Sequence, residues 1–260
     1  MNIVVLDDSP TVLLTLQSML EDLGVPANEI HLFESGFNAL EYIKTNGADL
    51  IFSDIQMPEF DGYAFVERLL ELSGKYASAL FVVSGEENFE AYTKMKSIGG
   101  KRFIRKPINP RYFNHFVSAD LAKIQNRMIH RSAQESRHPD LQPSSPPVHA
   151  NERWEDLASS IGLPAKYMPR LVTTFIKETK NTIPLLETAI EERNFPAIRH
   201  YAHAMKGSTG NMKLGSLYSL FGALEHAAGE EDCEYTFGIT FDTVEKKLES
   251  VIIEFEMLLS

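Results

Sequence analysis

The sequence of 260 residues has little cysteine and no long apolar run. Cys233 is alone, so neither a disulfide nor a cysteine-rich metal site can form within the chain. No stretch is apolar for long enough to span a bilayer, and the opening segment MNIVVLDD lacks the basic residues of a secretory signal. We therefore expect a cytoplasmic protein without membrane insertion.

Basic residues are also scarce, with 25 Lys and Arg against 36 Asp and Glu and a formal net charge of -11. Non-specific binding to nucleic acid is excluded, because a phosphate backbone must be met by clustered positive charge. No P-loop or glycine-rich ATP lid is present, so the chain is not expected to phosphorylate itself from ATP. Proteins or locally held anions remain as partners.

The first half alternates short apolar runs rich in β-branched residues with amphipathic segments. Strands this apolar, separated by helices, are buried on both faces, which predicts a doubly wound five-stranded parallel sheet. The predicted strands lie at residues 2–8, 30–33, 49–54, 80–84 and 101–107, and the helices at 11–23, 38–44, 63–72, 89–98 and from about 110.

The second half contains helical patterns alone, at residues 167–182, 185–192, 195–220 and 241–259, which predicts a four-helix bundle. Ser, Pro and charged residues without an apolar stripe separate the two halves, as is typical of a linker. We predict a first domain at 1–125, a linker at 126–150 and a second domain at 151–260. Whether the last helix of the first domain continues into the linker is left open.

Polar side chains stand at the predicted carboxyl ends of four strands: Asp7 and Asp8, then Asp54, Ser84 and Lys106. These ends meet at one edge of a parallel sheet, where ligand sites form. Three gathered carboxylates repel each other unless a cation neutralises them, and a few hard oxygen ligands suit Mg²⁺. One carboxylate can then attack a phosphoryl group while the lysine, the metal and the serine hydroxyl hold its oxygens. Each residue alone has an ordinary structural explanation, such as a helix cap or a surface charge; their joint placement favours a site.

These residues, with SDIQMPEFDG around Asp54 and Lys106-Pro107, resemble the signature of response-regulator receiver domains, which have a flavodoxin-like fold. The family commonly has a cis peptide bond into this proline. Asp61, in the same string, is interpreted as a helix cap or turn residue. The resemblance implies the following roles: Asp54 as phosphoacceptor; Asp8, Asp54 and the Gln56 carbonyl as metal ligands; Asp7 as support through water; Ser84 and Lys106 as phosphoryl ligands; and Phe103 as the switch aromatic.

The segment RHYAHAMKGSTGNMKLGSL carries three glycines in a helical pattern, although each interior glycine costs a helix about 1 kcal/mol relative to alanine. His203, Lys206, Gly207 and Gly210 share one helical stripe at i, i+3, i+4 and i+7. We expect the glycines to leave a docking surface beside a solvent-facing His203. Lys206 is expected to favour the neutral imidazole by charge repulsion and to hold phosphoryl oxygens after transfer.

The string HAMKGSTGNM resembles the H-x-x-K-G-S signature of histidine phosphotransfer (Hpt) domains, and the likeness extends over about residues 151–260. It implies that His203 is a phosphoacceptor supported by Lys206, Gly207 and Ser208. The alternative is an ordinary exposed helix residue. His200 lies on the same face but lacks the Lys-Gly pair at the proper offset, so it is interpreted as structural.

We therefore predict a two-component phosphorelay protein rather than an enzyme, apart from the receiver's own phosphorylation and dephosphorylation. Asp54 accepts a phosphoryl group from a histidine kinase or another phosphohistidine donor with Mg²⁺, and His203 exchanges one with a receiver aspartate, in cis or in trans. One alternative is an interaction module in which the receiver controls access to the Hpt domain. A Mg²⁺-dependent phosphohydrolase is disfavoured, because Gln56 stands where common aspartyl-phosphate hydrolases carry a second acid. The cognate kinase, the direction of flow and a receiver-mediated dimer are left open.

Overall fold

The computed structural model describes residues 1–57, 62–74, 76, 79–85, 93, 96–97, 102–132 and 152–260, with the backbone alone at 127–132 and 152. The helix predicted at 89–98 lies largely outside these ranges, and so does Asp61. Among the described residues, no helix combines the length and apolar character needed to cross a membrane.

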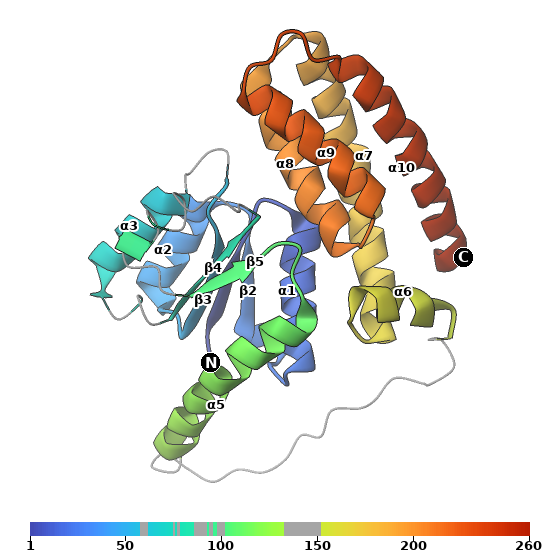
Figure 1. The fold of residues 1–260 in the computed structure, drawn as a ribbon. Coiled ribbons are helices and arrows are strands. Elements are labelled where there is room, and N and C mark those ends of the chain that lie inside the picture. The colour runs from blue at the N-terminus through green and yellow to red at the C-terminus, as the bar shows by residue number, and fades with distance from the viewer. Residues whose placement is uncertain are drawn as a thin grey trace.

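A parallel sheet forms the first domain, and its described strands run in the order β2-β1-β3-β4-β5 (Figure 1). All four neighbouring pairs are parallel. The predicted doubly wound sheet is therefore confirmed. The strands are β1 (Ile3–Leu6), β2 (Ile30–Phe33), β3 (Leu50–Asp54), β4 (Leu80–Ser84) and β5 (Phe103–Arg105).

Helices cover both faces of this sheet. Alternate strand residues such as Val5 and Phe52 pack in the same buried cluster as α1 and α5, whereas Val4 and Ile51 pack with α2 and α3. Burial on both faces explains why the strands are continuously apolar. The helices are α1 (Pro10–Asp22), α2 (Gly36–Asn46), α3 (Gly62–Leu72) and α5 (Pro110–Ser132). Because α5 continues to Ser132, it passes residue 125, and the domain boundaries stay predictions.

Helix α1 begins where the chain supplies a cap. The Ser9 side chain accepts a hydrogen bond from the Val12 backbone N–H, and Pro10 occupies the first turn, where its missing N–H is not needed. Every residue from Thr11 to Leu20 is buried, including the polar ones. A helix that covered one face of a sheet and met water on the other would not bury ten consecutive residues, so α1 is covered on its outer side as well.

A helical bundle forms the second domain and supplies this cover. Its elements are the short α6 (Glu155–Ile161) and the four long helices α7 (Met168–Glu191), α8 (Phe195–Asn211), α9 (Gly215–Gly229) and α10 (Phe237–Leu259). Figure 1 shows α7 and α8 on the side of the bundle that faces α1. Buried residues of α1 belong to the same hydrophobic cluster as Leu171, Phe175 and Met205 of the bundle. The two domains therefore share one apolar core across α1.

Two details of the bundle differ from the sequence prediction. The helices predicted separately at 167–182 and 185–192 form one helix, α7. It continues through Pro184, although an interior proline costs a helix about 3 kcal/mol. Conversely, the helix predicted across 195–220 is divided between α8 and α9. Lys213 adopts a left-handed φ of 59°, and Leu214 N–H donates to the Thr209 carbonyl, which closes α8 with a Schellman turn. Glycine is the usual residue at this position, and because Lys213 stands there instead, the sequence did not predict the end of α8.

Gly62 provides a test of how tightly the loop after β3 is packed. A Cβ atom at Gly62 would lie 2.3 Å from the Ile55 Cα and 2.6 Å from the Asp54 carbonyl oxygen. We expect Gly62→Ala to lower the free energy of unfolding by roughly 1–3 kcal/mol in urea titrations, because backbone atoms must move. Gly74→Ala is the control, since its Cβ would meet no described atom within 4 Å. Equal effects of the two substitutions would contradict the argument.

Candidate functional site

Three carboxylates gather at the carboxyl edge of the sheet, as the strand ends predict. Each of Asp7, Asp8 and Asp54 offers an oxygen within 4.8 Å of the others. Asp54 ends β3 and is fully buried, and its Oδ1 accepts hydrogen bonds from the backbone N–H groups of Ile55 at 2.7 Å and Gln56 at 3.2 Å. These bonds fix one carboxylate oxygen and leave Oδ2 directed toward other partners.

Lys106 joins the carboxylates from β5. Its buried Nζ lies 2.6 Å from Asp54 Oδ2 and 2.7 Å from Asp7 Oδ2. The Lys106 backbone N–H donates to the Ser84 carbonyl at 2.8 Å, which places the ends of β4 and β5 side by side. The peptide bond into Pro107 is cis. The structure thus brings together one ammonium and three carboxylates in a site shielded from water.

Burial and charge divide the pKa values of these groups. Burial raises the pKa of Asp7 to about 6 and that of Asp8 to about 7, with nearby carboxylates adding to the rise for both. Burial acts in the same direction on Asp54, but Lys106 and His203 outweigh it and hold the Asp54 pKa below its usual range. Burial would lower the pKa of Lys106, yet Asp54 and Asp7 raise it above the usual value. At neutral pH Asp54 is ionised and Lys106 is charged.

Asp8 is the residue whose surroundings fit a cation. Both of its carboxylate oxygens are buried and have no hydrogen-bond partner among the described residues. A buried carboxylate without a partner is costly, and a divalent cation bound to hard oxygens would remove that cost. The donor set of carboxylate oxygens, with backbone carbonyls nearby, suits Mg²⁺.

The remaining predicted residues of the first domain lie on or next to strands β3, β4 and β5. Gln56 follows Asp54 by two residues and is half-buried, and Ser84 ends the neighbouring strand β4. Phe103 is half-buried in β5 and packs against the cluster that α2 and α3 share with the sheet. The roles predicted for these three residues stay predictions.

His203 of α8 faces the acidic pocket from the bundle. Its Nε2 lies 3.8 Å from Asp54 Oδ2, and its Nδ1 lies 2.7 Å from Glu225 Oε1 on α9. The His203 side chain is 12% exposed, which differs from the open position expected for it. Burial would lower its pKa, but the nearby carboxylates of Asp54 and Glu225 raise it to about 9. The same contacts hold the pKa of Glu225 at about 2, against the effect of burial.

Lys206 acts through Glu225 rather than directly on the imidazole. Its Nζ donates to Glu225 Oε2 at 2.9 Å and lies over the Tyr218 ring, 5.6 Å from the centroid. The expectation that Lys206 keeps His203 neutral by repulsion is therefore wrong for this structure, because a carboxylate stands between the two cations and raises the His203 pKa instead.

The two glycines of the histidine helix lie against the first domain. A Cβ at Gly207 would lie 3.5 Å from Val12 Cγ2, and one at Gly210 would lie 3.2 Å from Pro107 Cβ and 2.9 Å from the Tyr218 ring. Small residues here allow α8 to approach α1 and the β5 loop closely. Ser208 is fully buried and donates to Glu178 Oε1 of α7 at 2.6 Å.

Sequence reasoning missed three functional neighbours. Glu225 was not singled out from the sequence. His200, interpreted as structural, places Nδ1 3.6 Å from Asp8 Oδ2. Glu178 had a readable signal, because it continues the apolar stripe of Leu171 and Phe175 at i, i+4 and i+7. An acid on a core stripe indicates a buried partner.

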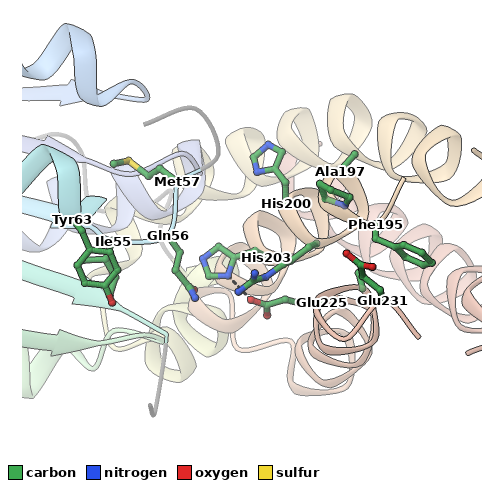
Figure 2. Close-up of a pocket in the computed structure, with 14 residues that line it drawn as sticks. Ile55, Gln56, Met57, Tyr63, Phe195, Ala197, His200, His203, Glu225 and Glu231 are labelled. Carbon is green, nitrogen blue, oxygen red and sulfur yellow. Dashed lines mark hydrogen bonds and ion pairs between the residues drawn. The ribbon is translucent and has the colours of Figure 1, made fainter. Parts of the chain in front are cut away.

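A pocket of about 700 Å³ opens at the domain boundary beside His203. Figure 2 shows Gln56, Met57 and Tyr63 on the side of the first domain and His200 and His203 on the side of the bundle. Two candidate phosphoryl acceptors, one carboxylate and one imidazole, thus lie opposite each other on two domains. This arrangement defines a phosphotransfer signalling protein.

Comparison with known families agrees with this class. A model of the response regulator receiver domain matches residues 3–117, and a model of the Hpt domain matches residues 170–251. The chain therefore carries a receiver domain followed by an Hpt domain, the two domain types that these family models describe.

Similar proteins include larger sensor kinases. The signal transduction histidine-protein kinase BarA of Escherichia coli K12 is 23% identical over 241 residues, covering 90% of this chain and 25% of that protein. Sensor histidine kinase GacS of Pseudomonas protegens is 30% identical over 118 residues, covering 44% and 12%. The chain thus spans a quarter or less of these relatives. Among solved structures, chemotaxis protein CheY4 of Vibrio cholerae is 24% identical with a TM-score of 0.39, covering 48% of this chain and 96% of that one.

The pKa of His203 can be measured directly. The folded value of about 9 lies above the ordinary 6.5, so the interaction stabilises the structure fully below pH 6.5 and is lost as the pH rises through about 9. In Mg²⁺-free buffer we expect Glu225→Gln to lower the His203 pKa, as followed by NMR of the imidazole C–H, because one carboxylate partner is gone. Glu254→Gln, an exposed change on α10, is the control. An unchanged His203 pKa in Glu225→Gln would contradict this assignment.

Proposed function

We propose that Asp54 accepts a phosphoryl group from a phosphohistidine donor, such as a histidine kinase, and that His203 exchanges a phosphoryl group with a receiver aspartate. The observation that carries the proposal is the 3.8 Å separation between His203 Nε2 and Asp54 Oδ2. The family matches over residues 3–117 and 170–251 support it.

In the first step, an oxygen of ionised Asp54 attacks phosphorus, and the bond from phosphorus to the donor nitrogen breaks with its electron pair left on the donor imidazole. Lys106 lies 2.6 Å from Asp54 Oδ2, so its ammonium is placed to hold negative charge on the phosphoryl oxygens. The Ser84 hydroxyl at the neighbouring strand end is the proposed second donor. Burial strengthens these interactions by excluding water.

In the second step, His203 Nε2 attacks the same phosphorus, and the bond to the Asp54 oxygen breaks with its electrons left on the carboxylate. Glu225 lies 2.7 Å from His203 Nδ1 and would keep the N–H at that nitrogen. Because the pKa of His203 is raised to about 9, Nε2 must first lose its proton, and its lone pair is then directed toward Asp54. Glu225 also stabilises the positive charge that the ring gains on phosphorylation, and Lys206 holds Glu225 in place. The reverse step uses the same groups.

Asp8, Asp54 and the Gln56 carbonyl are the proposed Mg²⁺ ligands, with Asp7 as support. Bound Mg²⁺ would neutralise phosphoryl oxygens and relieve the repulsion among the carboxylates. The buried oxygens of Asp8, which accept no hydrogen bond from the described residues, support this assignment.

Labelling distinguishes the two acceptors. Wild type, Asp54→Ala and His203→Ala are incubated with a phosphorylated histidine-kinase donor and Mg²⁺, and acyl phosphate is separated from base-stable phosphohistidine. We expect wild type to carry both linkages, His203→Ala to carry acyl phosphate alone, and Asp54→Ala to carry neither.

Equal phosphohistidine on Asp54→Ala and wild type would contradict the relay from Asp54 to His203. It would favour the alternative in which the receiver regulates access to the Hpt domain without passing phosphate to it. Lys180→Ala, an exposed change on α7, is the control and should carry both linkages as wild type does.

Cation binding should raise the thermal stability of the protein. Because the pKa values of Asp7 and Asp8 are raised from 3.8 to about 6 and about 7, their ionisation destabilises the fold increasingly from about pH 3.8 upward, and this destabilisation is fully present above about pH 7. At pH 8 we expect MgCl₂ to raise the Tm of wild type, and we expect Asp8→Asn to raise the Tm without Mg²⁺ and to abolish the Mg²⁺ increment. Glu67→Gln, an exposed receiver change, should keep the wild-type response. A full Mg²⁺ increment in Asp8→Asn would exclude Asp8 as a ligand.

A further inference from the structure

Glu178 is a buried acid that lies at the contact between the domains. It stands on α7, in the stripe that also carries Leu171 and Phe175, and only 6% of its surface is exposed. The phosphotransfer steps do not use it. A carboxylate removed from water is expensive unless hydrogen-bond donors surround it, so its partners indicate why it is there.

Two of the three hydrogen bonds of Glu178 come from the receiver. The Ser9 hydroxyl donates to Oε1 at 2.8 Å, and the Thr11 backbone N–H donates to Oε2 at 3.1 Å. The third donor is the Ser208 hydroxyl of the Hpt domain, at 2.6 Å from Oε1. The two hydroxyl oxygens also lie 2.8 Å apart, so Ser9, Ser208 and Glu178 form one buried polar network across the boundary.

The receiver donors sit at the N-terminus of α1. Ser9 is the N-cap, Pro10 has no N–H, and Thr11 is the first residue of the helix whose N–H can bind a partner. A carboxylate at this end of a helix is stabilised by the unpaired N–H groups and by the helix dipole. Glu178 therefore completes the cap of a receiver helix from the other domain.

A second hydrogen bond between the domains lies near Lys106. The side-chain oxygen of Asn211, at the end of α8, accepts a hydrogen bond from the Ile108 backbone N–H at 3.1 Å, just after Lys106-Pro107. One anchor thus binds the segment after Asp7-Asp8 and the other binds the segment after Lys106. Together they orient His203 toward Asp54.

We propose that the receiver of its own chain is the partner of His203, and that Glu178 is the specificity-determining residue that selects this receiver by capping α1. The inference rests on the proposed function and names the partner that it left open. A receiver without a hydroxyl at the position of Ser9 would leave the carboxylate short of donors when the domains dock, which disfavours that pairing.

The docked arrangement also closes the site to other proteins. Asp54 is fully buried, and α1, the helix beside the acidic pair, is covered by α7 and α8. An external phosphohistidine domain reaches Asp54 only when the receiver and the Hpt domain separate. Loss of Glu178 should therefore slow transfer within the chain and speed loading from outside.

Glu178→Leu is the variant of choice, because leucine suits the apolar stripe of α7 and cannot accept a hydrogen bond. In the full chain, Asp54 is loaded either with a small phosphoramidate donor or with a phosphorylated histidine-kinase domain, and label on Asp54 and His203 is followed over time. Lys180→Ala is the matched control, since Lys180 is exposed two residues along the same helix and forms a surface ion pair. Circular dichroism confirms that each variant retains its helices.

For wild type we expect the rate of transfer from Asp54 to His203 to be independent of chain concentration. Glu178→Leu should slow this step by roughly tenfold or more, since it removes hydrogen bonds to a buried charge. The same variant should load Asp54 faster from the kinase domain, and Lys180→Ala should change neither rate. A variant that merely damaged the fold would slow both.

The inference is overturned if transfer to His203 rises in proportion to chain concentration, or if a mixture of Asp54→Ala and His203→Ala chains transfers as fast as wild type. It is also overturned if Glu178→Leu behaves like Lys180→Ala. In these cases Asp54 and His203 are still labelled and the proposed function stands. Failure to label Asp54 in any chain would overturn the proposed function itself.

Discussion

The burial of α1 on two sides is the constraint on which the arrangement of both domains depends. On its inner side the helix covers the sheet, and on its outer side it packs against α7 and α8, so a single hydrophobic cluster runs from Val5 to Phe175. The segment that carries Asp7, Asp8 and Ser9 leads directly into this helix. The acidic pair is therefore held by β1 from one direction and by the bundle from the other. Any motion that separates the domains changes the surroundings of the metal-binding candidates as well as those of His203.

Charge balance explains why the histidine docks where it does. Among the described residues, three buried carboxylates face the ammonium of Lys106, and the pKa values of Asp7 and Asp8 rise because this cation does not offset their burial and mutual repulsion. His203 brings a second positive charge to the edge of this pocket, and the acid that it faces raises its pKa in return. Docking thus partly compensates the same negative charge that a divalent cation would compensate. The domain contact and cation binding are linked through a common electrostatic field.

The fold and the gathering of the candidate acceptor Asp54 with Lys106 were accessible from the sequence because they depend on local rules. Apolar strands alternating with helices specify a parallel sheet, and residues at strand ends such as Asp54 and Lys106 converge wherever the strands end. The environment of His203 was not accessible, because it depends on which helix packs beside α8. Glu225 is 22 residues away in the sequence, and its position reverses the expected effect of Lys206. The Ser9 to Glu178 bond, between residues 169 apart, joins two domains that sequence patterns treat separately.

Tethering determines how the docked state competes with outside partners. Because the two domains belong to one chain, each meets the other at an effective concentration on the order of 1 mM. A separate receiver or kinase domain present at about 1 µM is then outcompeted roughly a thousandfold when its intrinsic affinity is equal, by the ratio of the two concentrations. Exchange with other proteins therefore requires either a tighter external interface or a change that weakens the internal one. The proposed phosphorylation of Asp54 would place new charge and bulk between Asp54 Oδ2 and His203 Nε2, which lie 3.8 Å apart. The same modification that loads the receiver thus alters the contact that keeps it closed.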